Sequence, residues 1–211
     1  KFDKLACLWS MGKDSTVLLW LARKAFMGRV PYECAHIDTT FKFPEMYEFR
    51  ERIAKEWGLN LFVGTNQGAI ARGINYKNND PVTVCHELKT VGLQQAIALK
   101  KWNGLIVGIR RDEDGTRAKE KFFSPRNIDF EWDYKDQPPE LWNQFQTDFN
   151  KDTHVRIHPL LEWSELDVWE YVRREGIPSV SLYFAKDGKR YRTLGCQPIT
   201  KPVESHADTV D

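Results

Sequence analysis

Short apolar runs alternate with longer amphipathic stretches over the first half of the chain. Continuous apolar runs predict buried strands at residues 5–9, 32–38, 59–64 and 104–109. Apolar positions at helical spacing predict helices at residues 14–26, 44–57 and 86–101. Strands that alternate with helices of this length require right-handed crossovers, so we expect an α/β fold with an open, mostly parallel twisted sheet and helices on both faces.

The pattern changes after residue 109. Residues 110–154 are charged and aromatic with few apolar repeats, and a connection of about 45 residues favours a functional flap over a passive linker. A strand-like run and a helix capped by Ser164 follow, and the remaining C-terminal region is irregular. We therefore expect a single domain over residues 1–211, with a core at about 5–109 and a flap and loop-rich C-terminal elements at about 110–211.

Composition and charge narrow the class of protein. The 211 residues are 41% hydrophobic and 29% charged, which fits one soluble domain, and the net charge of +1 gives no general signal for nucleic acid. No apolar run approaches the roughly 18 residues that span a bilayer, so we expect no membrane partner. The first strand starts almost at residue 1 without a signal-peptide layout, so we expect a trimmed start. Four widely spaced cysteines predict no disulfide framework and a cytoplasmic location.

The stretch LWSMGKDSTVLLWL has the components of a phosphate cradle. Gly12 allows a tight turn between strand and helix, and the first helical turn offers free backbone N–H groups to an anion. Lys13 supplies a cation, and hydroxyl groups come from Ser10, Ser15 and Thr16. A plain helix start is the alternative, but it leaves a small polar run at the end of a central strand unexplained.

The spacing around Gly12 excludes a Walker P-loop, because Cys7 stands at its first glycine position and Asp14 follows the lysine. The stretch instead resembles the S-x-G-[KV]-D-S signature of the PP-loop ATP pyrophosphatase superfamily, with Met11 in place of a common glycine. Enzymes of that superfamily split ATP between the α and β phosphates. The resemblance implies that ATP, with Mg²⁺, binds the matching residues Ser10, Gly12, Lys13, Asp14 and Ser15.

Two further polar groups follow predicted strands. Asp38 and Thr39 end the second strand, and Arg110 and Arg111 end the fourth, where open α/β sheets bind ligands. The arginines form a candidate clamp for sulfate or phosphate, and a solvated surface of mixed charge is the alternative. Consecutive residues point to opposite faces of a strand, so both arginines reach one anion only if the chain turns. Asp38 is a candidate metal or ribose ligand, and we predict no metal site formed by the protein alone.

Three blocks in the expected order extend the resemblance to nearly the whole chain, from about Leu5 to Ser205. GIRRDEDGTRAKE, KTVGL and RYRTLGCQPIT are similar to blocks of the phosphosulfate-reductase branch, and within it to the small, ATP-binding subunits of sulfate adenylyltransferase. The resemblance implies an adenine nucleotide alpha hydrolase-like fold and the reaction of ATP with sulfate to give adenylyl sulfate and pyrophosphate. The resemblance alone further implies a GTPase large subunit as partner. From the residues themselves, we hypothesise that Lys13, Arg110 and Arg111 are catalytic and that Arg110, Arg111, Arg117 and Arg192 contact sulfate.

The chain also departs from that family. Members usually have a helical segment before the first strand, a longer insertion between SLYFA and RYRTLGC, and a C-terminal extension, which this sequence lacks. These segments bear on how a partner subunit docks.

Other enzyme classes remain open. A phosphosulfate reductase needs a C-terminal cysteine nucleophile, and its adenylyl-sulfate form adds a cluster that normally takes four thiolates. Cys85 and Cys196 each stand alone and no cysteine follows, so we expect no iron–sulfur cluster and a structural role for Cys196. A PP-loop enzyme that adenylates a tRNA or a sulfur carrier is a second alternative, although no basic stripe suits RNA. A nucleotide-binding regulatory subunit is the third, although a second anion clamp argues against it.

Overall fold

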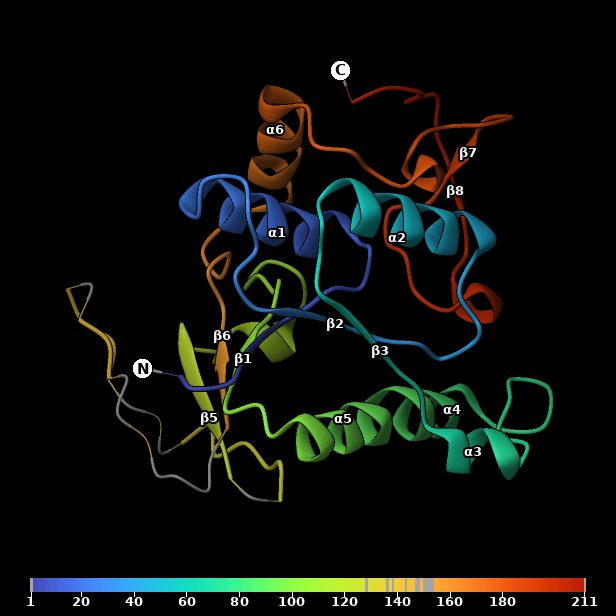
Figure 1. The fold of residues 1–211 in the computed structure, drawn as a ribbon. Helices are drawn as coiled ribbons and strands as arrows, with labels where there is room; N and C mark the ends of the chain where they lie inside the picture. The colour runs from blue at the N-terminus through green and yellow to red at the C-terminus, as the bar shows by residue number, and fades with distance from the viewer. Residues whose placement is uncertain are drawn as a thin grey trace.

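One six-stranded sheet organises the chain, in the order β3-β2-β1-β4-β6-β5 (Figure 1). The computed structural model describes residues 2–127, 129–135, 137, 139–142, 144–146, 149 and 154–210. The strands are β1 (Leu5–Leu8), β2 (Glu33–Ile37), β3 (Leu61–Gly64), β4 (Gly104–Ile106), β5 (Phe123–Arg126) and β6 (His154–Ile157). All neighbours in this sheet pair in parallel except β5, which runs antiparallel to β6 at the edge.

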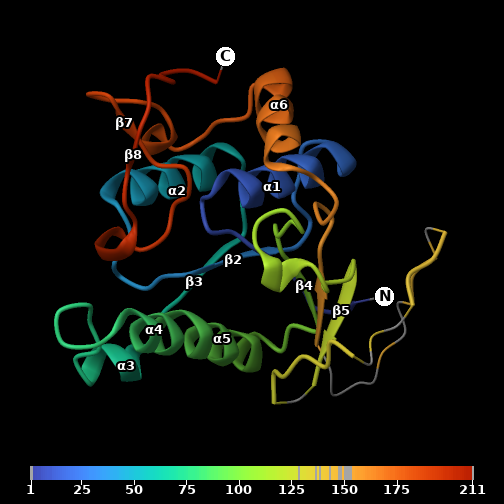
Figure 2. The ribbon, with the colours of Figure 1, turned by 180° about the vertical axis from the view of Figure 1, so that it is seen from behind.

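Helices cover both faces of the sheet in both views (Figures 1 and 2). One face carries α1 (Lys13–Ala25), α2 (Pro44–Glu56) and α6 (Glu165–Glu175). The other face carries α3 (Gln67–Ala71), α4 (Pro81–Cys85) and α5 (Gly92–Lys100), with the π-helical stretch His86–Val91 joining the last two. The α/β fold class predicted from the sequence, a mostly parallel sheet between two helical layers, is confirmed.

The two faces of the sheet have different cores. Large side chains fill the space under α1, α2 and α6, where Trp9, Leu19 and Met46 are almost completely buried. Smaller residues such as Ala6 and Ala35 line the α5 face. Small side chains on that face leave room near the strand ends, where one of the two cavities described below is found.

The C-terminal region packs against the carboxyl ends of β1 and β2. It contains the short elements Ser181–Tyr183, β7 (Lys189–Arg190), Gln197–Ile199 and β8 (Val203–Glu204). The backbone N–H of Lys13 donates to the Tyr183 hydroxyl at 3.1 Å, and the Cys196 thiol lies 3.1 Å from the Thr39 hydroxyl. The irregular end of the chain is therefore built into the edge of the sheet where ligands of α/β folds bind.

Some predicted boundaries are wrong. The predicted helix at 86–101 starts earlier, at Pro81, because the Asp80 carboxylate accepts from the backbone N–H groups of Val82 and Thr83 and caps it. The segment expected to be mostly loop contains β5, whose proline is tolerated because it lies in an edge strand. The fourth strand ends at Ile106 rather than at residue 109. Helix α3 and the β7–β8 pair were not predicted.

Removing the side chain of Leu105 should test the packing of the central strand β4. Leu105 is completely buried, so Leu105→Ala should lower the free energy of unfolding by about 2–5 kcal/mol in urea titrations. Leu99→Ala is the matched control, because Leu99 is 72% exposed on the neighbouring helix α5 and should change stability by less than about 0.5 kcal/mol. Equal losses in the two variants would contradict this assignment of the core.

Candidate active site

The chain turns from β1 into α1 through Met11, whose φ of 62° lies in the left-handed region. A side chain in this conformation costs roughly 1–2 kcal/mol, which explains why glycine is common at the equivalent position of related signatures. Burial of the Met11 side chain in the core offsets that cost. Gly12 gives α1 no side-chain cap, and the Lys13 N–H donates to Tyr183, so the next N–H groups of the first turn, those of Asp14 and Ser15, are available to an anion.

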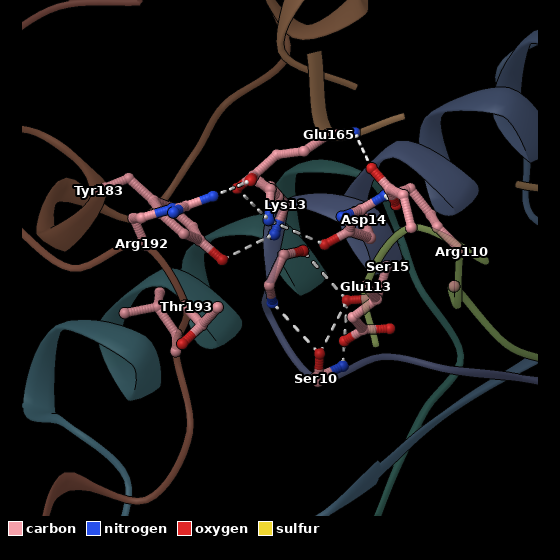
Figure 3. A pocket seen from close by; sticks show the side chains of 14 residues that line it. Ser10, Lys13, Asp14, Ser15, Arg110, Glu113, Glu165, Tyr183, Arg192 and Thr193 are labelled. Carbon is pink, nitrogen blue, oxygen red and sulfur yellow. Dashed lines mark hydrogen bonds and ion pairs between the residues drawn. The ribbon is translucent and has the colours of Figure 1, made fainter. Parts of the chain in front are cut away.

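Two serine hydroxyls fix the shape of this loop (Figure 3). Ser15 Oγ donates to the Gly12 carbonyl at 3.1 Å and accepts from the backbone N–H of Ser10 at 3.2 Å. Ser10 Oγ lies 3.1 Å from Ser15 Oγ and accepts from the Gly12 N–H at 3.4 Å. These hydrogen bonds hold the hydroxyls and amides of the loop in a fixed arrangement.

Gly108 brings the end of β4 against the start of α1. A Cβ atom at this position would lie 3.1 Å from the backbone carbonyl carbon of Asp14 and 3.1 Å from the backbone nitrogen of Ser15. Backbone atoms within a helix turn cannot move as a flexible side chain can. The sheet and the loop can approach this closely only because residue 108 has no side chain.

Lys13 is buried in the first turn of α1, with an exposed fraction of 4%. Its ammonium lies 3.3 Å from Asp14 Oδ2 and 3.4 Å from Glu165 Oε1, while Arg192 Nη2 donates to Glu165 Oε2 at 2.7 Å (Figure 3). Burial lowers the pKa of Lys13, and the charge of Glu165 opposes that shift. Burial alone would raise the pKa of Glu165, but the hydrogen bond from Arg192 and the charge of Lys13 hold it below its usual value.

Arg110 completes a closed ring of ion pairs and one backbone hydrogen bond. Its guanidinium is buried, forms an ion pair with Asp14 and donates through Nε to Asp112 Oδ1 at 2.8 Å. Asp112 Oδ2 then accepts from the backbone N–H of Glu165 at 2.8 Å, which leads back to the partner of Lys13. We call these five residues, Lys13, Asp14, Arg110, Asp112 and Glu165, the ion-pair ring. Carboxylates position both cations of the ring, and an incoming anion can replace those that contact Lys13.

Two adjacent cavities open at this edge of the sheet. The first, of about 460 Å³, is lined by the ion-pair ring together with the β1–α1 loop, Tyr183 and the segment 192–194. The second, of about 350 Å³, has apolar walls formed by Leu8, Ala35, Ile37, Leu93 and Val107. Both cavities are lined by Ser10, Ser15, Gly108, Glu113 and Leu194. A ligand with an anionic end and an apolar end could therefore occupy both.

Two neutral histidines line the second cavity. His36 Nδ1 lies 3.0 Å from the Trp9 carbonyl and His158 Nδ1 lies 2.8 Å from the Lys121 carbonyl, so Nδ1 carries the hydrogen in each ring. Burial lowers the pKa of both histidines to about 4. Each Nε2 is thus an acceptor, and neither has a hydrogen-bond partner in the described structure.

Most of the residues that the sequence singles out line these cavities. The first cavity is lined by Ser10, Gly12, Lys13, Asp14, Ser15, Arg110 and Arg192, and the second by Thr39 and Arg117. Asp38 and Arg111 line neither.

Asp38 and Arg111 make other contacts. Asp38 Oδ1 accepts from the Thr40 N–H and from the Tyr47 hydroxyl, so its carboxylate shapes the loop after β2. Arg111 Nη1 donates to Glu162 at 3.2 Å, outside the first cavity. The chain turns at residues 111–112, yet Arg110 and Arg111 contact different carboxylates. The structure therefore does not bring the two guanidinium groups together as a clamp for one anion.

The sequence did not single out several residues that line the cavities. The only sequence signal for Glu165 is its position directly after the Ser164 cap. The Tyr183 hydroxyl accepts from the backbone N–H of Lys13, which lies 170 residues earlier in the chain. Arg156 and His158 stand two residues apart at the end of β6, so both point to one face. That alternation of polar residues in an otherwise buried strand was the available signal.

Within the described ranges, no group of three or more His, Cys, Asp or Glu side chains could hold a metal ion. All four cysteines are free thiols. None of the helices among these residues is long and apolar enough to cross a membrane.

Comparison with known proteins decides the family. The phosphoadenosine phosphosulfate reductase domain family matches residues 4–202. The chain belongs to this family. Curated relatives include sulfate adenylyltransferase subunit 2 of Pseudomonas fluorescens (strain SBW25) and of Citrifermentans bemidjiense, each 40% identical over 100% of this chain and 80% of the relative. The predicted resemblance to the phosphosulfate-reductase branch and to these subunits is confirmed, and the designation of the relatives as subunit 2 implies a partner subunit for them.

Solved structures agree on the fold of the phosphoadenosine phosphosulfate reductase domain family. The phosphoadenylyl-sulfate reductase of Candida auris, in a phosphate complex, aligns with a TM-score of 0.68 at 18% identity, over 95% of this chain and 85% of that one. The FMN adenylyltransferase of Candida glabrata, in complex with FAD and pyrophosphate, aligns with a TM-score of 0.61 at 17% identity, over 94% and 57%. At this identity the two structures support the fold alone.

Gly108→Ala should disturb the site more than the fold. The added methyl group meets backbone atoms of the β1–α1 loop, so we expect a loss of about 1–3 kcal/mol in stability and a displaced cradle. Gly115→Ala is the control, because a Cβ there meets nothing within 4 Å. Phosphate-dependent thermal stabilisation of the two variants measures the effect, and an unchanged phosphate response in Gly108→Ala would contradict the role of this contact.

Acid should destabilise the protein through its buried histidines. Burial lowers the pKa of His36, His154 and His158 to about 4, whereas an unfolded histidine titrates near 6.5. The unfolded chain therefore binds more protons between about pH 6.5 and pH 4, and stability falls as the pH drops through that window, by up to about 1.4 kcal/mol per pH unit for each histidine. Urea unfolding at a series of pH values measures how the free energy of unfolding changes with pH. His158→Gln should reduce that slope by the amount that corresponds to roughly one bound proton.

Proposed function

We propose that this chain catalyses transfer of the adenylyl group of ATP to sulfate, with release of pyrophosphate. The observation that carries the proposal is the anion cradle at the start of α1, lined by buried Lys13 and Arg110 and adjoining an apolar cavity. Relatives that are 40% identical over the whole chain and are named sulfate adenylyltransferase subunit 2 support the same reaction.

In this proposal ATP occupies both cavities. Its β and γ phosphates lie in the cradle, where the first-turn N–H groups of α1, the serine hydroxyls and Lys13 complement their charge. Adenosine lies against the apolar walls of the second cavity, and the Nε2 atoms of His36 and His158 accept from its amino or hydroxyl groups. Thr39 lines the same cavity, so it remains a candidate nucleotide contact.

The donor set suits Mg²⁺ held mainly by phosphate oxygens. Glu113 lines both cavities, and its carboxylate forms no ion pair within the described residues, so it would hold the ion together with the phosphates. When bound, the ion supplies positive charge to the phosphate oxygens.

The protein contributes positioning and charge. Sulfate is already deprotonated at neutral pH, so no general base is required, and orientation of the reactants can supply on the order of 7–11 kcal/mol. Incoming phosphates replace Glu165 and Asp14 as partners of Lys13, whose ammonium then stabilises the charge that develops on departing pyrophosphate. Arg110 stays fixed between Asp14 and Asp112 and faces the same cavity.

We further propose that a large GTPase subunit assists this reaction. Adenylyl sulfate is a high-energy product, so the equilibrium favours ATP, and coupling to GTP hydrolysis would draw the reaction forward. The designation of the relatives as subunit 2 and the family resemblance support the partner. A cytoplasmic location and the lack of an iron–sulfur cluster remain predictions from the sequence.

Exchange of labelled pyrophosphate into ATP tests the function directly. With sulfate as acceptor, exchange should require sulfate, because pyrophosphate returns to ATP only from adenylyl sulfate. Exchange that proceeds equally without sulfate would indicate another acceptor, and reduction of adenylyl sulfate by a thiol donor would indicate a reductase. Nucleotide binding without any turnover, with the partner subunit present, would indicate a regulatory subunit.

Lys13→Ala should weaken ligand binding in the cradle while the protein remains folded. We expect sulfate-dependent exchange to fall by about 10²–10³ and ATP affinity to weaken, because a buried cation that faces phosphate is lost. The control is Lys24→Ala on the same helix, where the lysine is 52% exposed and pairs with Glu175 away from the cavity. ATP affinity equal to that of the wild type in Lys13→Ala, measured by calorimetry, would reject the cradle.

A further inference from the structure

The wall of the second cavity carries a cluster with more guanidinium groups than carboxylates. Arg117 and Arg156 line the cavity, and Arg126 lies behind them, almost fully buried. Glu120, with an exposed fraction of 2%, is the carboxylate buried among them. Arg126 Nη2, outside the cavity, donates to Glu120 Oε1 at 3.0 Å, while Glu120 Oε2 has no hydrogen-bond partner among the described residues.

The two arginines that line the cavity are poorly neutralised. Arg117 Nη1 lies 3.9 Å from the same Glu120 oxygen, and its Nε lies 4.0 Å from the more exposed Asp114, so both pairs are long. Arg156 forms no ion pair with any described residue, and its Nε is buried without a hydrogen-bond partner. Three guanidinium groups thus share one buried carboxylate.

A half-buried cation without a close partner is unfavourable, because it loses part of its hydration and gains little counter-charge. Arg156 shows this effect, since burial lowers its pKa and the neighbouring charge of Arg117 adds to the shift that Glu120 opposes. Arg126 differs, because it also donates to Ser124 and to the Pro125 carbonyl and stabilises β5. An anion in the cavity would complete the coordination of Arg117 and Arg156.

We infer that Arg117 and Arg156 form a subsite for a tetrahedral oxyanion, and that this oxyanion is the sulfate substrate. The identification of sulfate rests on the proposed function. Guanidinium groups bind such oxyanions in a bidentate manner, and two loosely neutralised cations match the two charges of sulfate. The second cavity adjoins the cradle along Ser10, Ser15 and Gly108, so sulfate and departing pyrophosphate occupy different cavities, as an in-line displacement requires.

Another pair of cations lines the same cavity and provides a comparison. Lys89 is exposed, and Lys42 has the negative charge of Asp38 nearby. An ammonium group is also a point charge that lacks the planar geometry of guanidinium. The arginine pair is therefore the better oxyanion site, and Lys42 offers a matched control variant in the same cavity.

The test uses Arg156→Met, Arg117→Met and Lys42→Met in the full chain. We expect the KM for sulfate in pyrophosphate exchange to rise about ten- to hundredfold in each arginine variant, with ATP affinity within about twofold of the wild type. Lys42→Met should leave the KM for sulfate within about threefold of the wild type. Nucleotide-free Arg156→Met should melt at the same temperature as the wild type or higher, because no carboxylate loses a close partner.

A second readout does not depend on turnover. Sulfate at constant ionic strength should raise the melting temperature of the nucleotide-free wild type more than that of Arg156→Met, and the general salting effect of sulfate is common to both. An equal rise in melting temperature with sulfate in the two proteins would overturn the subsite. This result does not depend on whether the protein catalyses the proposed reaction. Absence of sulfate-dependent exchange in the wild type, with protection that still requires Arg156, would reject the proposed function and retain the subsite.

Other outcomes overturn the assignment to sulfate. A weaker affinity for ATP with a normal KM for sulfate in Arg156→Met would mean that the cluster holds a phosphate of the nucleotide. A raised KM for sulfate in Lys42→Met alone would move the subsite to the lysines. A lower melting temperature of Arg156→Met with a normal response to both ligands would make the arginine structural.

Discussion

Burial of one ammonium group, that of Lys13, governs how this site is built. A lysine in the first turn of a helix is normally solvated, yet here it is 96% shielded and needs counter-charges from the protein. One comes from the adjacent Asp14 and the other from Glu165, at the start of α6. The Ser164 cap therefore does more than start a helix, because it fixes the residue whose carboxylate neutralises Lys13 and whose amide holds Asp112. The loop, α6 and the end of β4 are joined through these charges.

The sequence predicted the architecture because its strongest signals are local. Apolar runs and helical spacing identified β1 to β4, α1 and α2, and the cap at Ser164 identified α6. The errors come from features that depend on neighbours. β5 exists because β6 offers an edge to pair with, and its short FSPR sequence carries little strand signal of its own. The early start of α4 had a local signal in Asp80 and Pro81, which the apolar pattern alone does not detect.

The candidate site was predictable only in its contiguous part. The residues from Ser10 to Ser15 are consecutive, so a motif could identify them, and all but Met11 line the first cavity. Side-chain direction was not predictable for Arg110 and Arg111, because it depends on where the backbone leaves the sheet. Arg156 Nε and His158 Nε2 are buried without a hydrogen-bond partner among the described residues, and a linear sequence does not display which polar atoms are left unpaired.

The hydrogen bond from the Lys13 amide to the Tyr183 hydroxyl has a consequence for how the protein folds. It joins residues 170 positions apart, and the Thr39–Cys196 contact joins residues 157 apart, so the cradle is closed only when both ends of the chain meet. Contacts of such long range carry a large loop-closure entropy and form late. The sheet between them can assemble first from its crossovers. Nucleotide affinity then becomes a measure of complete folding, and a nascent chain that stops before Tyr183 would hold a sheet without a finished site.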